Sequence, residues 1–347
     1  MTASSALNKP VAKELPSPYL LFLGDATEPG YAKTAFGLRD WAPERCVGEW
    51  SCAGATVTTG LPRLNPREAR ARGARALLIG VANIGGIISE QWIPSLVEAL
   101  ESGLDIVSGM HTKLHATAAL RTVAERRGRQ LIDVRTPPEN IPVANGRRRS
   151  GKRLLTVGTD CALGKKYTAL ALTRAFAARG LSVDFRATGQ TGIMISGGGI
   201  PMDAVVADFE AGAAELLSPE APPLHWDVIE GQGSLFHPAY AGVSLGLLHG
   251  SQPDVIVVCH EVGRSHILGL SDYAMPTIEE TIELNLRLGR RTNSNIRCAG
   301  ISLNTARIDA EAAARLIAEA TGRLGMPVAD PLRGESAFDL LVDACLG

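Results

Sequence analysis

The stretch that decides the fold is "VGTDCALGKKYTALAL", residues 157–172. An apolar run ends at Gly158, a second glycine follows at Gly164, and a helix-forming segment begins at Lys165. This is the strand–loop–helix order of a phosphate-binding loop, in which backbone N–H groups and the helix dipole hold an anion and a lysine adds charge. We therefore expect nine consecutive residues to bind phosphate groups: Gly158, Thr159, Asp160, Cys161, Ala162, Leu163, Gly164, Lys165 and Lys166.

The loop lacks the hydroxyl that usually follows its lysine and holds the Mg²⁺ of a nucleoside triphosphate. Lys166 stands at that position, and an ammonium group repels a cation instead of coordinating it. Thr168 lies on a different side of the helix and is a poor substitute. We therefore expect no metal and favour a phosphate ligand that needs none, such as coenzyme A. A nucleotide hydrolase with altered metal ligands is the alternative.

The second half of the chain alternates strands and helices, which predicts a parallel sheet. The predicted strands are "RLLTVG", "LSVDFRA", "HWDVIEG", "DVIVVCH" and "IRCAGISL". The predicted helices lie near 164–180, 203–217, 276–290 and 308–324.

The first half has the same rhythm and predicts a Rossmann-like domain. Apolar runs typical of buried parallel strands are "YLLFLG", "ARALLIGVA", "LDIVSG" and "QLIDVR". Helices are expected around 31–40, 66–73, 90–102 and 113–127. Because this half has no GxGxxG motif, a bound dinucleotide is not supported. The fold class is thus α/β, with two doubly wound parallel-sheet domains, Rossmann-like and then P-loop NTPase-like.

The predicted boundaries are a flexible N-terminus at 1–18, the Rossmann-like domain at 19–140, a basic linker at 141–152 and the P-loop domain at 153–347. The linker region has five basic residues: Arg147, Arg148, Arg149, Lys152 and Arg153. Two interpretations stay open. The charges are either solvated, or they form a basic lip over the bound phosphates.

The composition excludes several classes of protein. The chain has 347 residues, 45% of them hydrophobic, which is enough for two cores. The formal net charge of −1 gives no basic field for nucleic acid. No signal sequence or long apolar span is evident, so we expect a cytoplasmic protein without a membrane partner. The six cysteines form no CxxC pair, which favours neither a zinc site nor a disulfide framework.

Other distinctive residues follow predicted strands, where open α/β sheets bind ligands. Candidate substrate-binding residues are Arg186, Gln190, Thr191 and Arg264, of which the arginines could clamp a carboxylate. A glycine loop without a ligand is the alternative for 185–199. In the first half, His111, Lys113 and His115 follow a strand, and we favour ordinary surface positions for them. Asp203 and Asp208 are expected on a helix, in part structural.

Candidate catalytic residues are Glu230, His260 and His237. Glu230 ends a strand and could act as a base or hold an amine, unless it is a structural carboxylate. His260 could carry a proton, whereas His237, in a His-Pro pair, could serve only as a helix cap. The spacing of His260, Glu261 and His266 matches no established zinc pattern. Cys161 as an acyl-carrying nucleophile is a minor alternative, because direct transfer needs no covalent step.

With these residues in hand, the chain resembles a bacterial family of two-domain proteins whose better understood members are D-glutamate N-acetyltransferases (DgcN-like). The resemblance covers nearly the full length. It rests on ordered blocks that include "PYLLFLGDA", "GVANIGG", "SGMHTKL", "DFRATGQTGI" and "HWDVIEGQGSLFHP". The phosphate loop also looks like that of dethiobiotin synthetase, which has Thr where this chain has Lys166.

The resemblance implies transfer of the acetyl group of acetyl-CoA to the amino group of a D-amino acid, D-glutamate first, in D-amino-acid catabolism. The family assigns no role to individual residues. The runner-up is an ATP-dependent ligase or kinase of the dethiobiotin synthetase type. Small-molecule substrates, no nucleic acid, no membrane and a homo-oligomer are the expected partners.

Overall fold

The computed structural model describes residues 14–334 and 336–347, and it divides into two compact units. The first unit comprises the chain up to Pro137 together with Gln190–Ala204. The second comprises Pro138–Gly189 and Val205–Gly347. Residues 1–13 of the predicted N-terminal segment lie outside the described residues.

The first unit contains a five-stranded sheet in the order β2-β1-β3-β4-β5, in which every paired strand is parallel. Its strands are β1 (Tyr19–Phe22), β2 (Cys46–Trp50), β3 (Ala76–Ile79), β4 (Asp105–Ser108) and β5 (Leu131–Asp133). All residues of β1, β3 and β4 are buried, as continuous apolar runs predict for a sheet covered on both faces. The edge strand β2 was not predicted.

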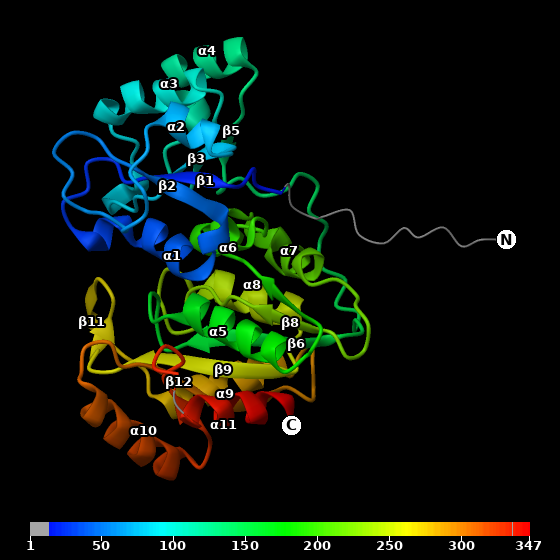
Figure 1. Ribbon diagram of the computed structural model, residues 1–347. Coiled ribbons are helices and arrows are strands. Elements are labelled where there is room, and N and C mark those ends of the chain that lie inside the picture. The colour runs from blue at the N-terminus through cyan, green and yellow to red at the C-terminus, as the bar shows by residue number, and fades with distance from the viewer. Residues whose placement is uncertain (1–13, 335) are drawn as a thin grey trace. The chain divides into compact units, whose positions relative to one another are not determined.

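Helices cover both faces of this sheet (Figure 1). The α-helices of the unit are α1 (Lys33–Trp41), α2 (Pro66–Ala71), α3 (Ile93–Glu101), α4 (Ala118–Arg127) and α6 (Gln190–Ser196). Helices α2, α3 and α4 enclose a core around Phe22 and Trp92, whose rings meet edge to face at 5.9 Å. Helices α1 and α6 pack against each other on the other face.

The second unit contains a six-stranded sheet in the order β13-β12-β9-β6-β8-β7, again with only parallel pairs. Its strands are β6 (Lys152–Gly158), β7 (Val183–Arg186), β8 (Trp226–Ile229), β9 (Val255–Glu261), β12 (Arg297–Asn304) and β13 (Val328–Ala329). An antiparallel hairpin of β10 (His266–Ile267) and β11 (Leu270–Ala274) follows β9. The fold class predicted for both halves is therefore confirmed.

Six α-helices surround the second sheet: α5 (Lys165–Ala178), α7 (Glu210–Leu217), α8 (Ala241–Ser251), α9 (Ile278–Gly289), α10 (Ala310–Leu324) and α11 (Ser336–Leu346). Helices α5 and α11 bury Phe176 and Leu341 against the sheet. The phosphate-loop segment lies between the central strand β6 and α5, as predicted.

Two local predictions were wrong. The predicted helix 203–217 begins only at Glu210, and Asp203 and Asp208 lie in separate 3₁₀ turns, Met202–Ala204 and Ala207–Phe209. The glycine-containing stretch 185–199 was expected to be a loop. It includes α6 instead, because the middle of that stretch packs as a helix on α1 in the first unit.

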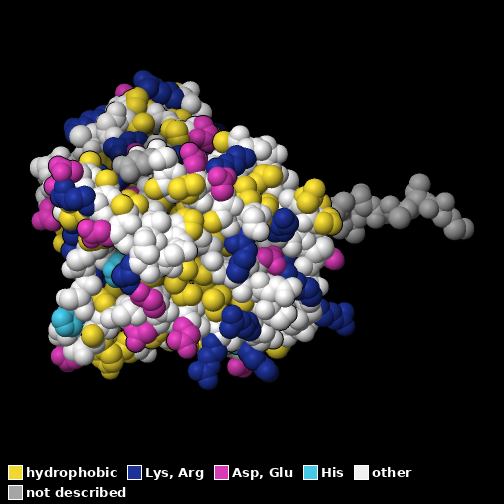
Figure 2. All heavy atoms as spheres, turned by 90° about the horizontal axis from the view of Figure 1, so that it is seen from below, with side chains coloured by type: hydrophobic (Ala, Val, Ile, Leu, Met, Phe, Trp, Pro, Cys, Tyr) yellow, Lys and Arg dark blue, Asp and Glu magenta, His cyan; other side chains and the backbone are white. Residues whose placement is uncertain are grey.

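Positive and negative side chains are mixed on the face of the molecule that Figure 2 shows. Lys and Arg side chains are interspersed there with Asp and Glu side chains, in keeping with a formal net charge of −1. Among the described residues, no helix combines the length and the hydropathy that crossing a bilayer requires.

Candidate functional site

The phosphate loop runs from the end of β6 to the first turn of α5. Gly164, directly before the helix, has φ of 111°, a left-handed conformation that favours glycine. Ala162 also has a positive φ of 53°, which is uncommon for a residue with a side chain. Strained backbone of this kind clusters at ligand-binding loops, and here it leads into the N-terminus of a 14-residue helix.

Lys165 is the buried cation of this loop. Its side chain is only 6% exposed, and its ammonium donates one hydrogen bond, to the backbone carbonyl of Asp160 at 2.7 Å. No carboxylate oxygen of the described residues lies within ion-pair distance of its Nζ atom. Burial lowers the pKa of Lys165, because the charged form loses hydration. A phosphate group placed at the loop would supply the missing countercharge.

Asp160 and Arg264 hold the loop in shape. One oxygen of Asp160 accepts the N–H of Cys161 at 2.6 Å, and the other accepts Arg264 at 3.0 Å and the N–H of Leu268 at 2.7 Å. Arg264 also donates to the Cys161 carbonyl at 2.8 Å and pairs with Glu261. These contacts tie the β10–β11 hairpin to the loop. Arg264 as a substrate clamp stays a prediction.

The residues after the lysine leave no hydroxyl at the expected metal position. The Lys166 ammonium lies over the Tyr167 ring, 4.3 Å from its centroid. The Thr168 hydroxyl is directed into the protein, where it lies 2.7 Å from the hydroxyl of Ser302 in β12. Thr168 therefore contributes to packing between α5 and the sheet.

His260, the sixth residue of β9, lies beside the loop. Its Nδ1 atom is 3.0 Å from the hydroxyl of Thr159, which orients the ring. Burial, and next the charge of Arg264, lower the pKa of His260 below its ordinary value, so the imidazole is neutral near pH 7. In the tautomer that donates from Nδ1 to Thr159, the Nε2 atom carries a lone pair and can accept a proton.

His237 has a different arrangement. Its Nδ1 atom accepts the backbone N–H of Ala239 at 3.1 Å, so the neutral ring carries its proton on Nε2. The ring is buried and stacks near Tyr240 with centroids 4.4 Å apart. These contacts agree with the helix-cap alternative, since the side chain closes the turn that leads into α8.

Glu230 follows β8 and is buried, with 4% of its surface exposed. Its Oε2 atom accepts the backbone N–H groups of Thr188 and Gly189, at 2.9 and 3.0 Å. Burial raises the pKa of Glu230, while the nearby lysines and these N–H groups oppose the rise. The adjacent Gly231 is essential for close packing, because a Cβ atom there would lie 1.6 Å from the Thr156 carbonyl oxygen in β6.

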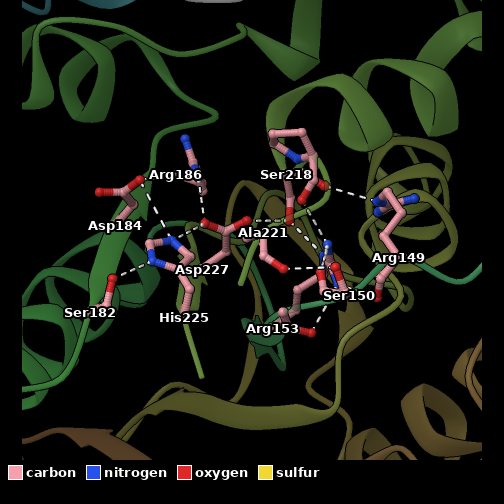
Figure 3. Close-up of polar contacts among 12 residues, drawn as sticks. Arg149, Ser150, Arg153, Ser182, Asp184, Arg186, Ser218, Ala221, His225 and Asp227 are labelled. Atoms are coloured by element: carbon pink, nitrogen blue, oxygen red, sulfur yellow. Dashed lines mark hydrogen bonds and ion pairs between the residues drawn. The ribbon is translucent and has the colours of Figure 1, made fainter. Parts of the chain in front are cut away.

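Arg186, the last residue of β7, is part of a polar network that lies along β7 and β8 (Figure 3). Its Nε atom donates to Asp227 at 2.7 Å, and an Nη2 atom lies 3.0 Å from Asp184. His225 contacts the same Asp227 oxygen at 3.2 Å. The other Asp227 oxygen accepts the hydroxyl of Ser218 at 2.6 Å. Arg186 as a substrate clamp stays a prediction.

Arg153 and Arg149 from the basic segment belong to the same network. The guanidinium of Arg153 donates to Ser218 at 2.7 Å and to four backbone carbonyls, and Arg149 donates to the carbonyls of Ser218 and Gly250. Strand β6 separates them from the phosphate loop by roughly 20 Å, at about 3.3 Å per residue. For these two arginines, both interpretations were wrong: they are neither a lip over phosphates nor solvated.

Gln190 and Thr191 belong to the first unit. The Thr191 hydroxyl is buried and lies 3.2 Å from that of Thr34 in α1. Gln190 borders a cavity at the carboxyl ends of the first sheet, which His111 also borders. The predicted substrate residues are thus divided between the units, with Arg186 and Arg264 in the second.

Two groups of side chains in the described ranges have ligand atoms close enough to hold a metal ion: Asp160, Cys161 and His237, and Asp184, His225 and Asp227. In each group the carboxylates already form ion pairs with arginine side chains. Burial raises the pKa of the Cys161 thiol, which disfavours the thiolate needed by a metal ligand or a nucleophile.

Several contributors were not foreseen in the sequence. They are Thr156, whose hydroxyl accepts the Gly231 N–H, Ser234, which donates to the Thr159 carbonyl, and the Leu268 N–H. Only the position of Ser234 in the GQGS block offered a signal, because the others act through backbone groups or short buried hydroxyls.

Comparisons with known proteins agree with this architecture. The profile described as "Domain of unknown function (DUF1611_C) P-loop domain" matches residues 142–341, and "Domain of unknown function (DUF1611_N) Rossmann-like domain" matches residues 44–137. A crystal structure of a DUF1611 family protein from Anabaena variabilis has a TM-score of 0.83 and 34% identity, covering 95% of this chain and 99% of that chain.

Two curated relatives are named D-glutamate N-acetyltransferase. The protein from Tritonibacter scottomollicae is 50% identical over 317 residues, 91% of this chain and 95% of the relative. The protein from Pseudoalteromonas sp is 49% identical over 320 residues, 92% of this chain and 96% of the relative. The predicted resemblance to this group is confirmed.

Proposed function

Because the chain belongs to the DUF1611 family, with a Rossmann-like and a P-loop domain, we propose that it is a D-glutamate N-acetyltransferase that uses acetyl-CoA. The observation that carries the proposal is the 50% identity, over nine-tenths of the chain, to a relative of that name. The local chemistry of the phosphate loop supports it. We retain the predictions of D-amino-acid catabolism and a homo-oligomer as parts of the proposal.

The phosphate loop suits the phosphate groups of coenzyme A. Lys165 is a desolvated cation whose one hydrogen bond within the described part of the chain goes to a carbonyl, so an anion relieves the cost of its burial. The N-terminus of α5 adds the positive end of the helix dipole. Lys166 adds charge at the position where a nucleoside triphosphate site would hold Mg²⁺. The positive charges of the loop can therefore neutralise the phosphate groups of a ligand that binds without a metal ion.

The reaction requires an uncharged amine and a base. The amine nitrogen of D-glutamate attacks the thioester carbonyl carbon, an N–C bond forms, the C–S bond breaks, and coenzyme A leaves as a thiolate that takes up from His260 the proton lost by the amine. His260 accepts the proton that the amine loses, because its imidazole is neutral and its ring is oriented by Thr159. Glu230 remains a candidate for the base, although the two hydrogen bonds that it accepts from backbone N–H groups favour a structural role.

The reaction is tested by mixing the protein with acetyl-CoA and D-glutamate, measuring thiol release, and identifying N-acetyl-D-glutamate by mass spectrometry. We expect one thiol per acetylated product and much slower release with L-glutamate. ADP formation from ATP that depends on D-glutamate, without thiol release, would instead identify the ligase or kinase type. No turnover with either cosubstrate would contradict both.

The base is tested by His260→Gln, with the exposed His266→Gln as matched control. Loss of a general base lowers the rate by about 10²- to 10⁴-fold, while the control keeps it. Since the pKa of His260 is lowered, the wild-type rate falls with decreasing pH only below the ordinary histidine range. If Glu230→Gln abolishes that acid limb and His260→Gln does not, Glu230 is the base.

A further inference from the structure

The first unit contains a cavity of about 190 Å³ at the carboxyl ends of its strands. It is bordered by Lys33 at the start of α1, by Asn83 after β3, by His111 after β4, by Arg135 after β5 and by Gln190 of α6. All of these residues belong to the first unit. The cavity is therefore complete within that unit and does not depend on the phosphate loop.

The topology of the sheet places the cavity where α/β folds bind ligands. In the order β2-β1-β3-β4-β5, β2 lies on one side of β1, and the later strands β3, β4 and β5 lie on its other side. The strand order therefore reverses at β1 and β3. Ligands of such sheets lie at the carboxyl ends of the strands, at this switch point. The cavity contains residues from the segments after both β1 and β3, Thr34 and Val81 among them.

The charge of the lining is positive. Lys33 and Arg135 border the cavity, and no Asp or Glu is among its described lining residues. Arg135 donates from Nε to the Gly109 carbonyl at 2.9 Å and from Nη1 to Asp203, which is outside the lining. A guanidinium has five N–H groups, so three stay available for a ligand. The N-terminus of α1 adds further positive potential.

Two glycines allow the segments that line the cavity to pack closely against one another. A Cβ atom on Gly109 would lie 3.0 Å from Gln190 and 3.1 Å from Met194, so the bare backbone lets α6 approach the end of β4. Gly86 has φ of 58°, and a Cβ there would lie 2.8 Å from the His111 backbone nitrogen. The positions of Gln190 and His111 at the cavity therefore depend on these two residues.

The volume limits the ligand. About 190 Å³ corresponds to roughly six water molecules, at about 30 Å³ each. Pockets for drug-sized ligands are larger, about 300–1,000 Å³. The cavity can therefore enclose a small metabolite but not a whole nucleotide or coenzyme A. Arginine recognises carboxylates by paired hydrogen bonds, and lysine adds a point charge.

We propose that this cavity binds a small dicarboxylate amino acid, with Lys33 and Arg135 on its carboxylates and Gln190 on its remaining polar atoms. This assignment rests on the proposed function in one respect, the identity of the ligand as the acceptor D-glutamate. The positive lining, the size and the switch-point location are independent of that function.

The test combines kinetics with direct binding. Lys33→Gln and Gln190→Leu are compared with Lys113→Gln, which changes an exposed lysine of the same unit that does not border the cavity. Losing a hydrogen bond to a charged group weakens binding roughly tenfold or more. We expect Lys33→Gln to raise the KM for D-glutamate by that factor, with the KM for acetyl-CoA and the thermal midpoint unchanged. The control keeps all three values.

Calorimetric titration with D-glutamate, succinate and methylamine, without acetyl-CoA, separates this inference from the proposed function. Binding of the two dicarboxylates, but not of methylamine, with loss in Lys33→Gln, supports the cavity even if no acetyl transfer occurs. Acetyl transfer with an unchanged KM for D-glutamate in both variants overturns the cavity assignment and leaves the proposed function standing.

Discussion

Lys165 and Arg153 are buried cations at opposite ends of strand β6, and they differ in how far their hydrogen bonds are satisfied. Arg153 has five N–H groups and directs all five at oxygen atoms of its own unit. Lys165 has three and uses one. Burial lowers the pKa of both. A buried cation with every donor paired supports the fold, whereas one with donors left over indicates a place for an anion.

The largest effect is expected at the satisfied cation. Arg153→Met leaves the Ser218 hydroxyl and four backbone carbonyls without the guanidinium that donates to them, and each buried polar group left unsatisfied costs about 1–3 kcal/mol. Urea unfolding followed by circular dichroism measures this loss. Arg147→Met, at an exposed position of the same segment, serves as control and changes the free energy of unfolding little. Equal stability of the two variants would contradict the comparison.

The next effect is expected at Lys165 and concerns binding instead of stability. Lys165→Met removes charged hydrogen bonds worth about 1.5–3 kcal/mol, so acetyl-CoA binds roughly 10- to 100-fold more weakly in a calorimetric titration. The free energy of unfolding is unchanged or increased, because a desolvated charge is gone. Lys152→Met is the matched lysine at the other end of β6. If Lys165→Met unfolds the protein as Arg153→Met does, the distinction between them fails.

A smaller effect concerns pH. Bound phosphates favour the ammonium form, so the pKa of Lys165 is higher in the complex than its lowered value in the free protein. Acetyl-CoA affinity therefore falls as the pH rises through the interval between these two pKa values, by at most about tenfold per pH unit for one proton. Titrations at increasing pH measure this slope. The same slope in Lys165→Met would assign it to another group.

The smallest effect is expected at Thr159, whose hydroxyl is directed at His260. Thr159→Val removes one hydrogen bond, worth about 0.5–1.5 kcal/mol, which corresponds to a fall in kcat of roughly 2- to 12-fold. Thr173→Val, in the middle of α5, is the control, because its hydroxyl donates to the Ala169 carbonyl in the preceding turn of the helix. Equal rates in both variants would show that the imidazole needs no orientation by Thr159.

Much of this architecture could be predicted from local patterns. Apolar runs such as Leu20–Phe22 mark strands covered on both faces, and the glycines at 158 and 164 with Lys165 mark the loop. Both signals come from residues that are close together in the sequence. The edge strand β2 was missed because "CVGEW" contains a glycine and a glutamate and is partly exposed.

The roles of the charged residues could not be predicted in the same way. The sequence around Arg153 shows a run of positive charge but not its partner Ser218, which is 65 residues away and comes close only through the crossover of the sheet. Likewise, nothing in the glycine-containing stretch after Arg186 shows that Gln190 will lie on Gly109 of the first unit. Such contacts are long-range products of packing.

The assignment of α6 to the first unit has a consequence for how the protein is made. On the ribosome, Pro137 emerges long before Gln190–Ala204, the last part of the first unit, is synthesised. At about 5–20 residues per second, the delay for these roughly 70 residues is of the order of 3 to 14 seconds. During that interval α1 has no α6 to cover it, so the first unit cannot complete its packing until the start of the second has been synthesised.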